Sequence, residues 1–169
     1  MIVAAGALLP GISWAGPLAG RRLPSFTLPD TNMKSHDSLD YRGKPLLLEV
    51  MQTACAHCKA SAPNIERVRA KYAGKIAVLS IVLPPDTQTT VAQFAAAYHV
   101  GSPILFDCGQ ATAAILQIKP QSPKVDLPQL VLVDAAGIIR DDWGWSEATK
   151  DVFEGQGLDV AIDAILKKK

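Results

Sequence analysis

The sequence carries little charge, and apart from three lysines at its end the Lys and Arg residues are scattered without forming a basic stripe. Its 169 residues include 17 Lys and Arg against 16 Asp and Glu, for a formal net charge of +1. Proteins that bind nucleic acid usually carry clustered positive charge, because they neutralise phosphates. A nucleic-acid partner is therefore not expected, and Lys167–Lys169 are interpreted as a solvated helix end that suits the helix dipole.

Charge is absent altogether from Met1 to Gly20, but Pro10 and Pro17 interrupt this apolar stretch. A membrane-spanning helix requires about 20 apolar residues without repeated breakers, so stable membrane insertion is not expected. The Ser-Trp-Ala tripeptide at 13–15 has the small-x-small pattern of a signal cleavage site. We interpret residues 1–22 as the remnant of an export signal, with a loose, disordered arm as the alternative. A periplasmic or otherwise exported protein is expected.

Cysteine is also scarce, with three in the chain, so a scaffold held together by several disulfides is excluded. Two of the three stand in the motif Cys55-Ala56-His57-Cys58. The motif follows Leu46–Met51, an almost continuous apolar run of strand length. It precedes a pattern of helical spacing that ends near Gly74. The pair is therefore expected at a junction between a buried strand and a helix.

The remainder, residues 23–169, is predicted to be one α/β domain, because strand-like and helix-like segments alternate along it. A short N-terminal hairpin is expected from Phe26–Asp30 and Ser38–Leu39, and a closing hairpin around the turn at 134–137. The other expected strands are 76–83 and 104–106, and the expected helices are 58–72, 89–98, 111–118 and 158–165. Thr89 and Thr90 are expected to cap the second of these helices. The prediction is a central mixed sheet flanked by helices, with an N-terminal β-hairpin extension.

A cysteine at the start of a helix is favoured as a thiolate, because free N–H groups and the helix dipole stabilise negative charge there. Cys55 is thus the expected nucleophile, and Cys58, one turn further on, is expected to resolve a mixed disulfide. A zinc site would need two more ligands, and Cys108, His36 and His99 are distant in sequence. A c-type haem site would need His at position 59, which is Lys59. A purely structural disulfide would not need a strand-to-helix junction.

The order of these segments resembles the TlpA/ResA-like branch of the thioredoxin superfamily, within the broader AhpC/TSA redoxin group. The resemblance covers Phe26–Asp30, Asp40–Lys44, the strand and motif that follow, and Pro63 within the next helix. It implies the thioredoxin fold and thiol–disulfide exchange. Three departures are that Ala54 replaces the usual tryptophan before the first cysteine, that His57 or Ala56 replaces the usual proline between the cysteines, and that the loop before Leu127 is longer than usual.

The same resemblance implies that the Leu127–Pro128 bond is cis and lies beside the cysteine pair, where a substrate chain docks. Leu127, Pro128, Ala54 and Ala56 are accordingly expected to line the substrate site. The alternative is an ordinary trans proline that begins an edge strand.

Two polar residues near the motif are assigned supporting roles. Glu49 interrupts the apolar strand, six residues before Cys55, and its place is similar to that of the buried acid in thioredoxin. Burial would raise its pKa and let it exchange a proton with Cys58. The alternative is a partly solvated strand end, or a glutamate paired with a nearby lysine such as Lys75. His57 is expected to favour the Cys55 thiolate and make the disulfide more oxidising, unless it is only a surface histidine.

The sequence therefore predicts a thiol–disulfide oxidoreductase that acts on protein disulfides or dithiols and is reset by a redox partner. No cofactor beyond the Cys55–Cys58 pair is expected. A copper-delivery module using His99 is one alternative, and a peroxidase is another, although Gln52 stands where a peroxidase needs Thr. Cys108 is interpreted as a small buried hydrophobe, with an extra resolving or regulatory thiol as the alternative. Trp143 and Trp145 are interpreted as core residues.

Overall fold

The computed structural model describes residues 16–167, and its centre is a five-stranded mixed sheet in the order β5–β4–β3–β6–β7. These strands are β3 (Leu46–Met51), β4 (Ala77–Val82), β5 (Ile104–Phe106), β6 (Gln129–Val133) and β7 (Ile139–Gly144). β3 is parallel to β4 and antiparallel to β6, so the sheet is parallel on one side and antiparallel on the other. Every residue of β3 is buried, as its apolar sequence predicts.

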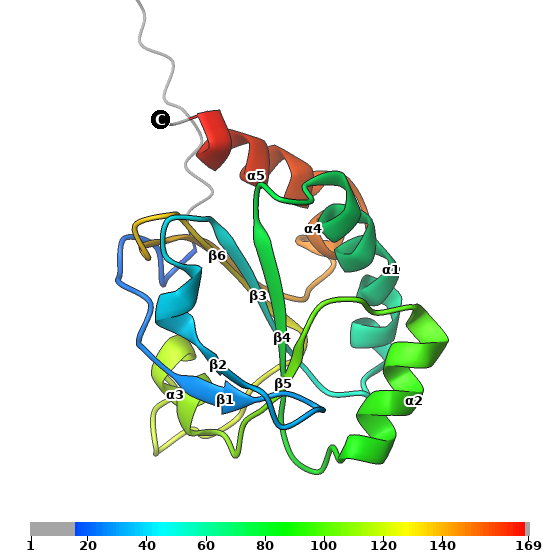
Figure 1. The fold of residues 1–169 in the computed structure, drawn as a ribbon. Coiled ribbons are helices and arrows are strands. Elements are labelled where there is room, and N and C mark those ends of the chain that lie inside the picture. Colours follow the sequence, from blue (N-terminus) through cyan, green and yellow to red (C-terminus); the bar gives the residue numbers. More distant parts are fainter. Residues whose placement is uncertain (1–15, 168–169) are drawn as a thin grey trace, which may run out of the picture.

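Helices cover both faces of the sheet (Figure 1). They are α1 (Ala56–Lys71), α2 (Gln88–Tyr98), α3 (Gln110–Leu116), α4 (Lys150–Glu154) and α5 (Gly157–Lys167). Side chains of β3 alternate between the faces: Leu47 packs with α1, α4 and α5, whereas Leu46 and Leu48 pack with α3 and the N-terminal segments. No helix within residues 16–167 is long and apolar enough to cross a membrane.

The predicted N-terminal hairpin forms, with β1 (Thr27–Pro29) antiparallel to β2 (Ser35–Asp37). Its second strand ends earlier than expected. Ser38 and Leu39 lie in a 3₁₀ turn, η1 (Ser38–Tyr41), because the Asp37 side chain accepts a hydrogen bond from the Leu39 N–H and caps that turn.

The packed domain begins before Leu23, which corrects the boundary expected from the sequence. Leu18 is buried in the core, and its N–H donates to the Asp142 side chain over 2.8 Å. The N–H of Gly20 donates to the carbonyl of Ile139 in β7. Residues 16–22 thus pack beside β7. Of the residues 1–22 that are interpreted as an export signal, residues 1–15 lie outside the described residues.

Two other local expectations were wrong. Thr87, not Thr89 or Thr90, caps α2, and it forms a reciprocal capping box with Thr90. The C-terminal region contains two helices, because a short α4 precedes the expected last helix. α4 places Phe153, which is fully buried, against α1 and α5.

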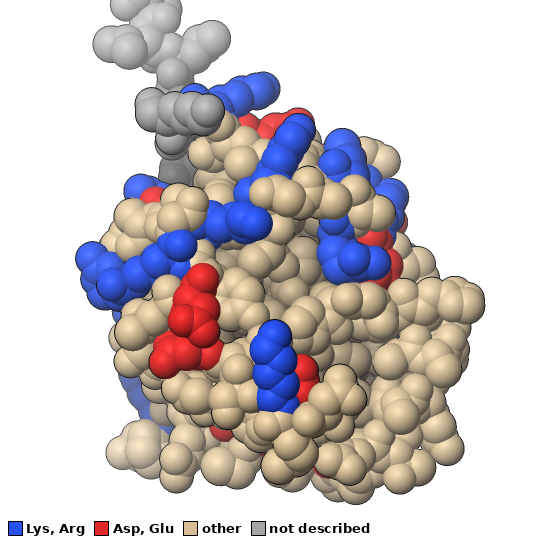
Figure 2. Space-filling model, in the orientation of Figure 1, with Lys and Arg blue, Asp and Glu red and all other residues tan. Residues whose placement is uncertain are grey.

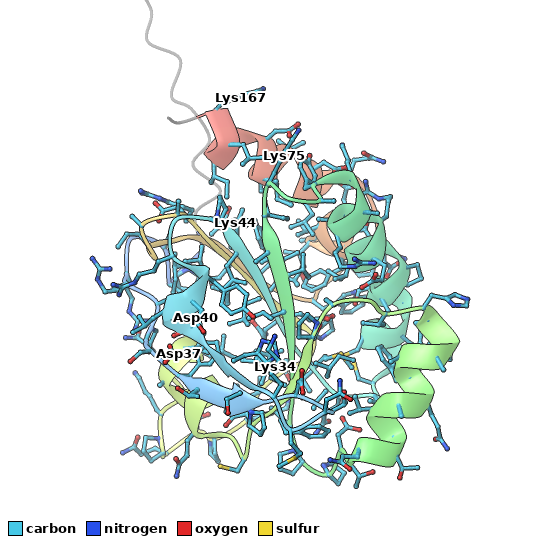
Figure 3. The ribbon with its side chains drawn as sticks, in the orientation of Figure 1. Lys34, Asp37, Asp40, Lys44, Lys75 and Lys167 are labelled. Atoms are coloured by element: carbon cyan, nitrogen blue, oxygen red, sulfur yellow. The ribbon has the colours of Figure 1, made fainter. Side chains whose placement is uncertain are left out.

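Charged side chains are distributed unevenly over the surface. Figure 2 shows most of them over the upper part and one side of the molecule and a few in the lower middle, while the surface over α2 carries none in this view. Figure 3 shows Lys44, Lys75 and Lys167 at the same end of the molecule. Lys44 precedes β3 and Lys75 precedes β4, so this basic end is opposite the end where β3 leads to Cys55.

Candidate active site

The two motif cysteines lie where β3 ends and α1 begins. Cys55 is the N-cap of α1, and its sulfur accepts a 3.2 Å hydrogen bond from the Cys58 N–H. This contact supplies a polarised donor to the sulfur at the positive end of a helix, which stabilises a thiolate there. Cys55 is half-buried, whereas Cys58 is fully buried. The structure thus gives the two sulfurs the different exposures expected of an attacking and a resolving cysteine.

Cys58 lies in an apolar cluster with Met51, Ala62 and Val82. Burial raises the pKa of its thiol well above the ordinary value, and the neighbouring Cys55 and Glu49 raise it further. Cys58 is consequently held as a thiol in the reduced protein and needs a proton acceptor before it can attack another sulfur.

Glu49 is buried beneath α1, on the same face of β3 as Leu47 and Met51. One carboxylate oxygen accepts a 2.8 Å hydrogen bond from the hydroxyl of Ser80, its neighbour in β4. The other lies 3.4 Å from the hydroxyl of Ser61, which also donates to the Cys58 carbonyl. Burial raises the pKa of Glu49 to about 7, although the two serine hydrogen bonds oppose the shift.

The alternative partner expected for Glu49, Lys75, is not near it. Lys75 is exposed and precedes β4 at the basic end of the molecule (Figure 3), whereas Glu49 lies opposite Ser80 in the middle of the sheet. Among the described residues, no cation forms an ion pair with Glu49. The carboxyl group is therefore a buried titratable group whose polar partners are hydroxyls.

The Leu127–Pro128 segment lies beside Cys55. The peptide bond between these residues is cis, and Pro128 is buried at the start of β6. The Cys55 thiol lies 3.7 Å from the Leu127 carbonyl and donates to it. Ala54 and Ala56, which flank Cys55 in the sequence, are both exposed. The structure thus brings together all four residues expected to line a substrate site.

A polar contact that sequence reasoning missed holds the loop before Cys55. The Asp86 carboxylate accepts a 2.8 Å hydrogen bond from the Thr53 N–H and another from the Thr53 hydroxyl. The same carboxylate accepts from the hydroxyl of Thr90 in the first turn of α2. The Gln52 side chain also donates to the Pro84 carbonyl. The loop that carries Cys55 is thereby joined to the loop between β4 and α2.

His57 contacts Trp145 rather than Cys55. The imidazole and indole rings are stacked, with centroids 3.4 Å apart and planes inclined by 19°. Within residues 16–167, no hydrogen bond joins the His57 ring to the Cys55 sulfur. Sequence reasoning placed Trp145 in the core, and its indole does pack against the core cluster. Its contact with the motif was missed because the two residues are far apart in sequence.

The remaining candidates lie elsewhere. Cys108 is exposed just before α3, which corrects its interpretation as a buried hydrophobe. His99 is the C-cap of α2, an 11-residue helix about 16 Å long, so it lies at the far end of that helix from Thr87. His36 is buried in the hairpin between Asp30 and Tyr41. Within the described part of the chain, no three His, Cys, Asp or Glu side chains are grouped as metal ligands.

The model of the AhpC/TSA family matches residues 19–142, most of the chain. The chain belongs to the AhpC/TSA family. Within the family it is similar to thioredoxin-like protein YneN of Bacillus subtilis, with 27% identity over 142 residues, 83% of this chain and 79% of YneN. It is also similar to the thiol–disulfide oxidoreductase ResA of Bacillus anthracis, with 26% identity over 137 residues, 80% of this chain and 75% of ResA.

Solved structures extend the comparison to the fold. A Chlorobium tepidum protein assigned as the thiol:disulfide interchange protein DsbE superimposes with a TM-score of 0.71 at 23% identity, covering 88% of this chain and 97% of that one. A secreted disulfide oxidoreductase of Mycobacterium tuberculosis gives 0.64 at 21% identity, covering 82% and 95%. The predicted TlpA/ResA-like resemblance and the thioredoxin fold are confirmed, and this AhpC/TSA-family chain is an oxidoreductase.

Proposed function

We propose that this chain exchanges disulfides with protein substrates through Cys55 and Cys58. The observation that carries the proposal is the asymmetry of the pair. The half-buried Cys55 sulfur accepts the Cys58 N–H at the start of α1, while the buried Cys58 is held as a thiol. The names of the relatives YneN and ResA support the same chemistry.

The reaction begins when the Cys55 thiolate attacks one sulfur of a substrate disulfide. The S–S bond of the substrate breaks, a mixed disulfide forms, and one substrate thiolate leaves. Cys58 then loses its proton and attacks the Cys55 sulfur, which releases the second substrate thiol and leaves the Cys55–Cys58 disulfide. Two electrons pass to the substrate, and the reverse sequence oxidises a substrate dithiol.

Glu49 is the proposed acceptor for the Cys58 proton. With a pKa of about 7, its carboxyl group is divided between its two protonation states near neutral pH. The Ser61 hydroxyl lies between the Glu49 carboxylate and the Cys58 carbonyl, which keeps the acid close to the first turn of α1. A group with a pKa near the working pH transfers protons most efficiently in both directions.

The Leu127–Pro128 segment is the proposed docking site for the substrate chain, with Ala54 and Ala56 on the exposed rim. Its support is the contact between the Leu127 carbonyl and the Cys55 sulfur. We also propose that the chain works outside the cytoplasm and is reset there by a redox protein. The uncharged, apolar N-terminal sequence and the secreted Mycobacterium tuberculosis protein of the same fold support export.

The deciding experiment is the equilibrium reduction potential of the pair in glutathione buffers, with thiols counted by alkylation and mass. A reversible two-electron couple in wild type that is absent from Cys55→Ser and Cys58→Ser is the expected result. A value above about −180 mV indicates an oxidase or isomerase, and one near about −270 mV indicates a reductant. The absence of a reversible couple at every buffer ratio would overturn the proposal.

A further inference from the structure

Trp145 contacts both sides of the proposed substrate site. Its indole ring stacks on His57, in the first turn of α1, with centroids 3.4 Å apart. Its backbone N–H donates a 3.1 Å hydrogen bond to the Pro128 carbonyl. Trp145 thus joins the helix that carries the cysteines to the segment that faces them, although it lies 88 positions after His57 in the sequence.

The position of the Trp145 ring is set by packing. The indole is partly buried against the core cluster that contains Phe153 and Trp143. Its N–H is buried and has no acceptor among the described residues, so no hydrogen bond fixes the ring. The backbone is fixed separately, because Gly144 pairs with Gln129 where β7 meets β6. The His57 ring therefore rests on a surface that is anchored to the sheet.

The residues next to Cys55 increase the importance of the stacking between Trp145 and His57 for the spacing of the site. Ala54 is small and exposed, so no bulky side chain precedes Cys55 to form a wall of the site. On the other side, Cys55 reaches the Leu127 carbonyl over 3.7 Å, a weak contact to sulfur. The stacked rings are the larger contact between the two sides of the site, since stacked aromatic rings prefer a defined separation and orientation.

We infer that Trp145 is a positioning residue. By stacking on His57 it sets the spacing between the start of α1 and the Leu127–Pro128 segment. This spacing favours reaction with extended protein chains over reaction with small disulfides. This inference rests on the proposed function. A small disulfide needs only the Cys55 sulfur, whereas a protein chain must also lie along the Leu127–Pro128 segment. Loss of the stacking between Trp145 and His57 is therefore expected to slow reaction with proteins more than reaction with small disulfides.

The test compares rate constants of the reduced protein with two probes, disulfide-bonded insulin and oxidised glutathione. In Trp145→Ala, the ratio of the second-order rate constant for insulin to that for glutathione is expected to fall about tenfold, because the insulin chain loses its positioned docking segment. Trp145→Phe keeps an aromatic ring and is expected to restore most of the ratio. Thermal unfolding of both variants identifies any general loss of structure.

Variants of His57 separate stacking from charge. His57→Phe can still stack, whereas His57→Asn cannot, so the ratio is expected to be about fivefold higher in His57→Phe than in His57→Asn. Equal ratios in the two, or a wild-type ratio in Trp145→Ala, would overturn the inference. NMR provides a direct readout, because the ring protons of His57 should lose an upfield ring-current shift in Trp145→Ala. If the wild type reacts with neither probe, the proposed function fails instead.

Discussion

The Glu49 carboxylate lies directly across from Ser80 in the parallel pair of β3 and β4, and it accepts the Ser80 hydroxyl hydrogen bond over 2.8 Å. This arrangement places an acid where an alternating or fully apolar strand would have a hydrophobic side chain. Hydroxyls compensate the burial of a carboxyl group less fully than a cation would, so the pKa of Glu49 rises to about 7. The stability of the fold and the proposed chemistry then depend on the same proton.

The free energy of unfolding is expected to fall as pH rises from about 4.5 to about 7 because of Glu49, and to level off above that range. In the fold this group keeps its proton up to about pH 7, whereas in the unfolded chain it ionises near 4.5. Its contribution is therefore complete below pH 4.5 and is lost as pH rises through 7, by about 3 kcal/mol. Urea unfolding of wild type and Glu49→Gln at pH 5 and pH 8.5 measures this loss. At each pH, the difference in the free energy of unfolding between the two proteins cancels the contributions of the other titratable groups. A difference independent of pH would contradict the prediction.

Glu49→Gln should also slow the resolution of the mixed disulfide. The amide cannot accept the Cys58 proton, so release of a substrate thiol is expected to be slowed about 10²-fold or more near pH 7. Stopped-flow kinetics with an oxidised peptide separates this step from the initial attack by Cys55. An equal slowing of both steps would show that Glu49 acts on the structure of the site instead.

The three cysteines should differ in their reaction with iodoacetamide at pH 7.5. In Cys55→Ser, the buried Cys58 is expected to react at least about tenfold more slowly than Cys108, because its thiol is shielded and its pKa is raised. Cys108 is exposed and serves as an internal reference. Mass spectrometry of peptides after timed quenching gives the two rates in this variant, and equal rates for Cys58 and Cys108 would contradict the burial of Cys58.

Asp86→Ala should destabilise the loop that carries Cys55. The substitution leaves the N–H and hydroxyl of Thr53 without their acceptor, and an unpartnered buried polar group costs about 1–3 kcal/mol. Asp86→Asn retains one carbonyl oxygen and should lose less. Asp126→Ala removes an acid from an exposed pair with Lys124 and is the matched control, expected to have little effect. Urea unfolding compares the three variants.

Leu18→Ala tests whether the segment before Leu23 belongs to the domain. Leu18 is 6% exposed and packs in the core, so its truncation is expected to cost about 2 kcal/mol or more. Leu39, which is 46% exposed, provides a leucine control whose truncation should have little effect. If the two variants have the same unfolding midpoint, the segment contributes nothing to the fold.

The parts of the fold that the sequence predicted are those fixed by local pattern. The apolar run 46–51 is a central strand, and the Gly137 turn joins β6 to β7 as expected. Three threonines stand near the start of α2, and periodicity could not choose among them. Thr87 is the N-cap through its reciprocal hydrogen bonds with Thr90, and the Thr90 hydroxyl also donates to Asp86, which contacts Thr53 through the tertiary structure.

The sequence predicted some residues of the candidate site and missed others. The cysteines and Glu49 stand close together in the sequence, so their spacing alone places them near the end of β3. The partners of these residues come from distant segments, and no local pattern marks them: Ser80, Asp86 and Trp145. The exposure of Cys108 was also missed, because the end of a short edge strand can turn its next residue inward or outward.

The unequal exposure of the two sulfurs also prevents two protein partners from reacting with this protein at the same time. Because Cys58 lies beneath the surface, the proposed function requires that a protein that delivers electrons and one that receives them both approach the half-buried Cys55. They must therefore use the same face and cannot be bound together. Turnover with two protein partners should follow ping-pong kinetics, and each partner should act as a competitive inhibitor of the other.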